Sequence, residues 1–194
     1  MQKDTPEKKS ENISETIVFI NNQFLPKSEA KISAFDHGFL YGDGVYETLL
    51  ISHFTVQNFE SHYKRIQNSC EILGIAFPIY CDSSEKIQKI LENLIEKNQK
   101  FLENKNSEFS GRGRVRITIS RGENNFDFSS CHQATVLISL SPLPPYPEKI
   151  MREGVSIKTI RLERSYPEIK VRIFWRHSSE GEKFLEPLTM KQYL

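Results

Sequence analysis

Residues 114–120 alternate strictly between apolar and polar side chains, and this pattern constrains the fold more than any other feature of the sequence. Successive side chains of a strand point to opposite faces of a sheet. One face of this strand must therefore be buried, while the other can stay open to water or to a ligand. The apolar face carries Val115, Ile117 and Ile119, and the polar face carries Arg114, Arg116, Thr118 and Ser120. The chain is predicted to build a sheet that needs a covering layer on one side.

Other segments have the composition of strands. Residues 17–20 and 23–25 are apolar and flank Asn21-Asn22, which predicts a tight hairpin. Residues 45–51 and 135–140 are rich in β-branched, aromatic and aliphatic side chains. These segments can pair with residues 114–120 in one mixed or antiparallel sheet.

Two segments have helical periodicity and can supply the covering layer. In the first, apolar residues recur every three or four positions from Phe59 to Leu73, with Asn58 placed to cap the start and Gly74 to end it. The second opens at Ser83 or Ser84, and its apolar stripe continues to Leu102. Strands and helices of this kind predict an α+β fold.

The expected domain organisation follows from changes in composition. Residues 1–15 are polar and are expected to form a disordered tail, and residues 16–140 a small N-terminal α+β domain. Residues 141–147 hold four prolines and are expected to be a stiff interdomain linker, unable to join a helix or a central strand. Residues 148–170 are expected to begin a second, incomplete C-terminal domain. Its first strand is predicted at 155–162.

Charge and cysteine usage exclude several classes of protein. The 26 Lys and Arg residues against 25 Asp and Glu give a net charge of +1, so we expect no nucleic-acid partner. The N-terminus lacks the apolar run of a signal peptide, and no apolar stretch is long enough to span a membrane. The three cysteines are widely spaced, which suits reduced thiols in the cytoplasm. The five histidines have no metal-ligand spacing, so we expect no metal.

Four motifs, in order, change the interpretation of residues that are ordinary when taken singly. A lone lysine, for example, is usually a solvated surface charge. The motifs are Lys31-Ile-Ser-Ala-Phe-Asp-His-Gly-Phe-Leu-Tyr-Gly-Asp-Gly-Val-Tyr-Glu-Thr-Leu49, Phe59-Glu-Ser-His-Tyr-Lys-Arg65, Ile119-Ser-Arg-Gly122 and Pro167-Glu-Ile-Lys170. Together they resemble the class IV, or fold-type IV, aminotransferases that use pyridoxal 5'-phosphate. The resemblance runs from about Thr16 to Lys170. That family includes branched-chain aminotransferases, D-amino-acid aminotransferases and aminodeoxychorismate lyases.

The resemblance implies roles for three residues, and the strand pattern adds a fourth candidate. Lys170 matches the lysine that condenses with the aldehyde of pyridoxal phosphate and then moves protons. Arg65 matches the arginine that binds the cofactor phosphate, for which a planar guanidinium is well suited. Tyr46 matches a residue of the substrate pocket. From its place on the polar face of residues 114–120, Arg116 could meet a substrate carboxylate or form an ion pair on the sheet surface. Arg121 is interpreted as a charge that flanks a turn.

The sequence departs from the family pattern after Lys170. The family continues with Ser, Asn, a Leu-Ala pair and a further domain, whereas this chain reads Val171-Arg-Ile-Phe-Trp-Arg-His177 and ends at Leu194. We interpret residues 171–194 as a non-family tail and hypothesise a reading-frame slip at the Lys170 codon. Resequencing the gene tests this hypothesis, since an intact frame without family-like continuation would reject it. A chain truncated in this way is expected to bind the cofactor poorly and to have little or no activity.

Three functions remain open at this stage. The first is amino-group transfer between an amino acid and a 2-oxo acid, and the second is a pyridoxal-phosphate lyase acting on aminodeoxychorismate. The sequence Gly42-Asp-Gly-Val-Tyr-Glu47 slightly favours the D-amino-acid and lyase-like members. The third is a non-catalytic remnant that at most dimerises. If the chain folds, a homodimer is expected.

Overall fold

The computed structural model describes residues 15–103, 110–123, 133–143, 147–157 and 170. The tail predicted for residues 1–15, apart from the exposed Glu15, and the non-family tail at 171–194 lie outside the described residues. The strands are β1 (Ile17–Ile20), β2 (Gln23–Pro26), β3 (Gly44–Ser52), β4 (Thr55–Val56), β5 (Gly113–Ser120) and β6 (Thr135–Pro142). The helices are α1 (His37–Leu40), α2 (Phe59–Leu73), α3 (Ser84–Lys97), α4 (Gln99–Leu102) and α5 (Glu148–Glu153).

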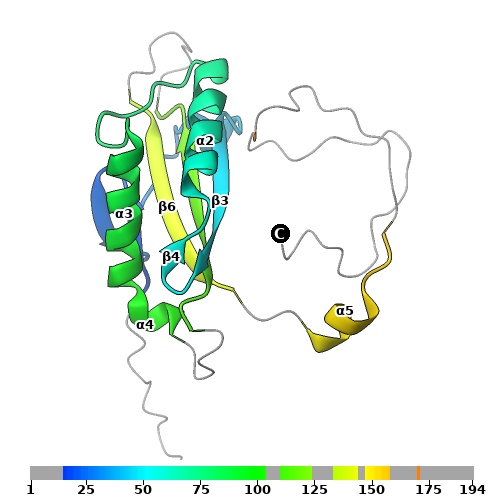
Figure 1. Cartoon of the computed structure of the whole chain (residues 1–194). Coiled ribbons are helices and arrows are strands. Elements are labelled where there is room, and N and C mark those ends of the chain that lie inside the picture. Colours follow the sequence, from blue (N-terminus) through cyan, green and yellow to red (C-terminus); the bar gives the residue numbers. More distant parts are fainter. Residues whose placement is uncertain (1–14, 104–109, 124–132, 144–146, 158–169, 171–194) are drawn as a thin grey trace, which may run out of the picture.

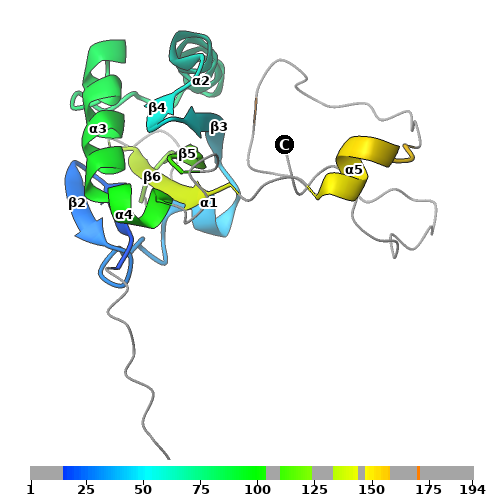
Figure 2. The same cartoon turned by 60° about the horizontal axis from the view of Figure 1, so that its bottom comes forward.

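The strands form one sheet in the order β2-β1-β6-β5-β3-β4, and every neighbouring pair is antiparallel. Helices α2 and α3 cover one face of this sheet, with α2 packed on β3 and α3 on β1 (Figures 1 and 2). The expected α+β fold, with an antiparallel sheet and two long helices, is confirmed.

The core lies between the sheet and the two long helices. On β5, the apolar side chains Val115, Ile117 and Ile119 are buried, whereas Arg116 is exposed, as the alternation predicts. The other large contributors are Phe19, Leu49, Ile51, Ile66, Ile87, Leu91, Leu94 and Ile138. The polar face of β5 therefore lies on the other side of the sheet from α2 and α3.

The predicted hairpin and first long helix are both present. Asn21 and Asn22 have φ angles of 44° and 68°, the left-handed backbone that a two-residue hairpin turn requires. Helix α2 ends at Gly74, where φ is 62° and the N–H bonds to the carbonyls of Cys70 and Glu71. The expected cap at Asn58 is wrong in one respect, because its side chain makes no capping hydrogen bond and its backbone is left-handed at φ 52°.

The second helical stripe is divided by Asn98. Ser83 caps α3 through a hydrogen bond to the N–H of Lys86, as predicted. Asn98 is buried, and its side chain amide bonds to both the N–H and the C=O of Ile17, at 2.8 and 2.9 Å. The same amide donates to Leu94 C=O at 2.8 Å. The stripe therefore continues as a separate short helix, because the end of α3 is fixed to β1.

The segment from residue 141 onwards differs from its prediction. Strand β6 extends to Pro142, which pairs with Gly113, so a proline ends a strand inside the sheet. Strand β1 pairs only with residues 137 and 138 of β6, so the missing N–H of Pro142 removes no bond to β1. Pro147 directly precedes α5 and lies outside it, so the described residues of the linker add none to a helix, as predicted.

The second domain is described only in part. Residues 155–157 form no regular element, so the predicted strand is absent there, and residues 158–162 lie outside the described part. Helix α5 has no buried residue and lies apart from the sheet in both views (Figures 1 and 2).

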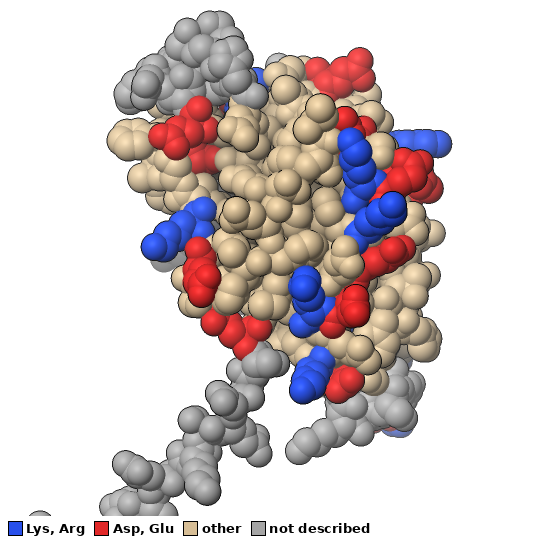
Figure 3. Space-filling model, turned by 90° about the vertical axis from the view of Figure 1, so that its left-hand side faces the viewer, with Lys and Arg blue, Asp and Glu red and all other residues tan. Residues whose placement is uncertain are grey.

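The surface that includes β2 and α3 carries interspersed charges of both signs, as Figure 3 shows, and forms no field of a single sign. Such a face gives little attraction to a polyanion. Of the helices in the described ranges, none combines the length and apolar character that crossing a membrane demands.

Candidate active site

Strand β3 places Tyr46 and Glu47 on opposite faces of the sheet. Glu47 pairs with Ile117 and shares its face with Val45 and Leu49, beneath α2. Tyr46 pairs with Thr118 and therefore lies on the polar face of β5. Successive residues of one strand thus contribute to both sides of a possible site.

Glu47 is joined to α2 by three hydrogen bonds. Arg65 donates from Nε to Oε1 at 2.5 Å and from Nη2 to Oε2 at 2.6 Å, a bidentate pair. His62 Nδ1 lies 2.7 Å from the same Oε2 and donates to it. The Glu47 side chain is 1% exposed, whereas that of Arg65 is 47% exposed. The carboxylate of Glu47 is therefore buried beneath α2, and the guanidinium of Arg65 reaches the surface.

The three donors keep Glu47 ionised. Burial raises the pKa of this carboxyl, but the hydrogen bonds from Arg65 and His62, with the charges of Arg65 and Lys170, together lower it. The carboxylate in turn raises the pKa of Arg65 through its hydrogen bonds.

Lys170 is held at the edge of β3 that faces away from β5. The N–H of Tyr46 donates to Lys170 C=O at 3.1 Å, and this hydrogen bond holds residue 170 against the strand. Lys170 Nζ lies 5.1 Å from the centroid of the Tyr46 ring, and Arg116 Cζ lies 3.8 Å from the same centroid. The structure therefore brings Lys170, Tyr46 and Arg116 together.

The surroundings of Lys170 favour its neutral amine. Burial lowers the pKa of Lys170, the charge of Glu47 raises it, and the charges of Arg65 and Arg116 lower it again, with a net lowering. A lysine with a lowered pKa is a better nucleophile near neutral pH, because more of it carries a free electron pair.

Glu47 and His62 were not identified from the sequence, although the structure places them at the centre of the charged group. A signal for Glu47 does exist in the alternation of β3, where a carboxylate takes a position between the buried Val45 and Leu49. His62 lies on α2 three residues before Arg65, the spacing at which side chains share a helix face. A buried acid needs donors, and this face of α2 provides them.

Arg121 has a structural place that agrees with its interpretation as a turn-flanking charge. It donates from Nε and Nη2 to Asp43, at 2.6 and 3.2 Å, and also to the carbonyls of Leu73 and Gly74. Arg121 thus ties the turn before β3 to the C-terminal end of α2. Within the described residues, no group of acids, histidines and cysteines is arranged to hold a metal ion.

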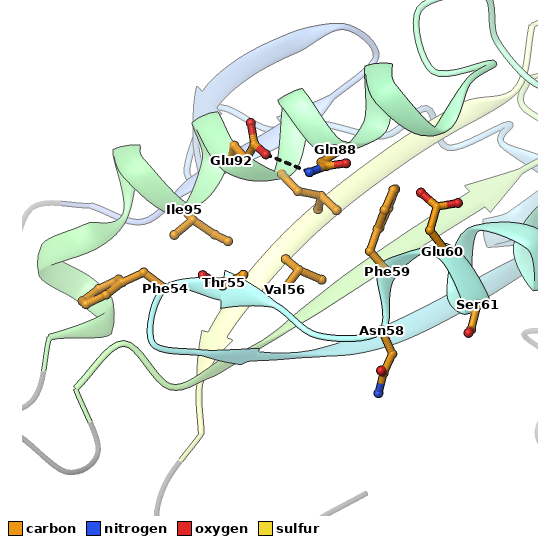
Figure 4. Close-up of a pocket in the computed structure, with 11 residues that line it drawn as sticks. Phe54, Thr55, Val56, Asn58, Phe59, Glu60, Ser61, Gln88, Glu92 and Ile95 are labelled. Carbon is orange, nitrogen blue, oxygen red and sulfur yellow. Dashed lines mark hydrogen bonds between the residues drawn. The ribbon is translucent and has the colours of Figure 1, made fainter.

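A groove of about 470 Å³ lies between β4, the start of α2 and α3 (Figure 4). Its lining combines apolar side chains such as Val56 and Phe59 with the acids Glu60 and Glu92. Its lining contains no basic side chain and none of Lys170, Tyr46 and Arg116. The groove therefore does not suit an anionic ligand.

Comparison with known proteins decides the family. The model of the family described as "Amino-transferase class IV" matches residues 44–173, more than half of the chain. The chain belongs to this family. The matched region of this class IV aminotransferase family member includes β3, α2, β5, β6 and Lys170.

Curated relatives of this family member catalyse more than one reaction. Aminodeoxychorismate lyase of Bacillus subtilis is 28% identical over 163 residues, covering 83% of this chain and 51% of that protein. D-alanine aminotransferase of Staphylococcus aureus is 26% identical over 145 residues, covering 74% and 47%. The chain spans about half the length of the curated relatives it matches.

Solved structures of similar proteins share the fold. A hypothetical aminotransferase of Mycobacterium tuberculosis, in its alpha-ketoglutarate- and PMP-bound form, has a TM-score of 0.56 at 22% identity, covering 72% of this chain and 44% of that one. The 4-amino-4-deoxychorismate lyase of Pseudomonas aeruginosa has a TM-score of 0.52 at 23% identity, covering 71% and 44%. At these identities the likeness establishes the fold alone.

Proposed function

We propose that this chain carries the lysine and the phosphate-binding arginine of a pyridoxal 5'-phosphate enzyme. Lys170 is the attachment residue, Arg65 binds the cofactor phosphate, and Tyr46 and Arg116 face the substrate. The observation that supports this proposal is that Lys170, whose pKa is lowered, meets Tyr46 and Arg116 at one edge of β3, the strand that also carries Glu47 and its partner Arg65.

The described residues fit such a cofactor in both charge and chemistry. Pyridoxal phosphate supplies an aldehyde carbon, an electron-accepting ring and an anionic phosphate. Lys170 offers a nucleophilic amine for the carbon, and the same Nζ can afterwards hold a proton beside the reacting carbon. Arg65 offers a half-exposed guanidinium for the phosphate. Tyr46 provides an aromatic wall, and Arg116 a cation suited to a carboxylate.

The proposed reaction is amino-group transfer between an amino acid and a 2-oxo acid. Lyase chemistry on aminodeoxychorismate is the second candidate, favoured by the 28% identity to the Bacillus subtilis lyase. Both reactions need the same lysine and the same phosphate site. Product analysis with each substrate class, using the full chain, distinguishes them.

We also propose that the chain associates as a homodimer. Exposed apolar side chains gather on the segment that contains α1, where Ile32, Phe35 and Phe39 are 44%, 56% and 71% exposed. Large apolar side chains left exposed close together in the sequence suit an interface. The mass in size-exclusion chromatography with light scattering tests this proposal, and a monomer at micromolar concentration would contradict it.

Reductive trapping tests the central proposal. The full chain is incubated with increasing pyridoxal phosphate, reduced with borohydride, digested and analysed by mass spectrometry. We expect the phosphopyridoxyl group on Lys170 before any other lysine, and loss of the selective labelling in Lys170→Ala but not in Lys64→Ala. Equal labelling of all lysines would support a non-catalytic remnant instead.

A further inference from the structure

Glu47 occupies a position where a carboxylate is costly. It lies between Val45 and Leu49 on the core face of β3, opposite Ile117, and is almost wholly buried. An ionised carboxylate removed from water loses free energy unless hydrogen bonds and opposite charges compensate for it. An apolar side chain would fill this place in the core at lower cost. The presence of Glu47 at this position therefore needs an explanation beyond packing.

Glu47 determines the orientation of Arg65. Two of the three guanidinium nitrogens, Nε and Nη2, bind its carboxylate, so the plane of the guanidinium is fixed. His62 holds Oε2 from a further direction. Among the described residues, Nη1 of Arg65 has no hydrogen-bond partner, and the side chain is about half exposed. An arginine held in this way loses little conformational entropy when it binds an anion.

We propose that Glu47 is a positioning residue, which holds the guanidinium of Arg65 so that its Nη1 side can bind the phosphate group of the ligand that reacts with Lys170. His62 supports Glu47 in this role. The identity of the ligand rests on the proposed function, whereas the coupling of Glu47 to anion binding does not.

This role differs measurably from that of a structural brace between β3 and α2. A brace would affect every ligand of Lys170 to the same extent, because its loss would disturb the fold. A positioning residue affects only ligands that carry a phosphate. Pyridoxal and pyridoxal phosphate share the aldehyde and differ in the phosphate, so they separate the two roles.

The experiment compares the concentrations at which the two aldehydes label Lys170 in the full chain, after borohydride trapping. The wild-type chain is expected to favour pyridoxal phosphate, and Glu47→Gln is expected to lose about tenfold of this preference, the effect of one charge-assisted hydrogen bond. Arg65→Gln should lose the preference too, and the double variant should lose no more than Arg65→Gln alone. Glu71→Gln is the matched control, since Glu71 is an exposed acid on α2.

Several outcomes would overturn the inference. These are an unchanged phosphate preference in Glu47→Gln, an equal loss of reactivity toward both aldehydes, and a wild-type chain that does not distinguish them. If wild-type Lys170 reacts with neither aldehyde, the proposed function fails, and inorganic phosphate then tests the inference. Phosphate should shift the Arg65 Nε–H resonance in the wild-type chain and not in Glu47→Gln, and no shift in the wild-type chain would reject the positioning role. Glu47→Asp provides a second variant if Glu47→Gln does not fold.

Discussion

Lys170 lies within reach of charges of both signs, and their balance sets how readily its amine reacts. Burial, Arg65 and Arg116 favour the neutral amine, whereas Glu47 favours the charged form. Because the pKa of Lys170 is lowered, a larger fraction of its amine is unprotonated than in an ordinary lysine at the same pH, when that pH lies below the usual lysine pKa. Reactivity therefore depends on residues from β3, α2 and β5.

A pH series of competitive acylation tests this balance. Trace labelling of Lys170, followed by mass spectrometry and normalised to the exposed Lys64, is expected to rise to its plateau at lower pH than in a denatured reference. Glu47→Gln should move the rise to still lower pH, because the charge that raises the pKa of Lys170 is removed. A profile for Lys170 that coincides with the denatured reference would contradict the lowered pKa.

Much of the site's composition could be predicted at the residue scale, but not how its charges are joined. Lys170 and Tyr46 follow from the motifs and Arg116 from the alternation of β5, and the structure places the three together. The sequence does not show that Arg65 forms an ion pair with a buried acid. Contacts between Glu47 and α2 depend on how the helix lies on the sheet, which local patterns do not specify.

At the scale of the elements, the glycines that follow α2 and β5 differ in how much room they leave for a side chain. Gly74 ends α2 at φ 62°, and a Cβ there would meet no atom within 4 Å. Gly122 follows β5 at φ 92°, and a Cβ there would overlap the carbonyl oxygen of Gln133. Its own carbonyl accepts the N–H of His37 at 2.9 Å, which fixes the start of α1.

Alanine at these two glycines is expected to have unequal effects. Gly74→Ala should cost about 1 kcal/mol, since only the left-handed backbone is strained. Gly122→Ala should cost about 3 kcal/mol or more, because the backbone of Gln133 must also move. Urea unfolding measures both variants. Equal losses would show that the contact between Gly122 and Gln133 is relieved without cost.

The elements that could be predicted are those long enough to show a period, together with the short β1–β2 hairpin, which its turn residues Asn21 and Asn22 reveal. Alternation predicts β5, and apolar recurrence predicts α2 and α3. Helix α1 and strand β4 have four and two residues, too few for a period to appear. Helix α1 depends instead on Asp36, which caps it and accepts a hydrogen bond from Ser120 Oγ at 2.8 Å. Such contacts between distant residues leave no local pattern.

At the scale of the whole molecule, all of the buried core that the described residues form comes before α5 in the sequence. The core draws its residues from β1 to β6 and the helices between them, while α5 adds no buried residue. The sheet and its two covering helices therefore contain the interactions that a cooperative unit needs.

A shortened chain tests this organisation. A variant ending at Leu143 is expected to unfold in a single cooperative transition, with a free energy of unfolding within about 1 kcal/mol of the full chain. A variant ending at Glu123, without β6, should not fold, because β6 joins β1 to β5. Circular dichroism during thermal unfolding provides the measurement. Loss of the transition in the longer variant would show that later residues are needed.

The position of β6 between β1 and β5 also imposes an order on biosynthesis. Of the described strands, β1 and β2 leave the ribosome first, yet β6, the neighbour of β1 in the sheet, is the last to emerge. A two-stranded ribbon is marginally stable in water, so this hairpin must wait, with its apolar side chains unprotected, until translation has passed residue 138. The nascent chain should be most vulnerable to proteases and most dependent on chaperones during that interval.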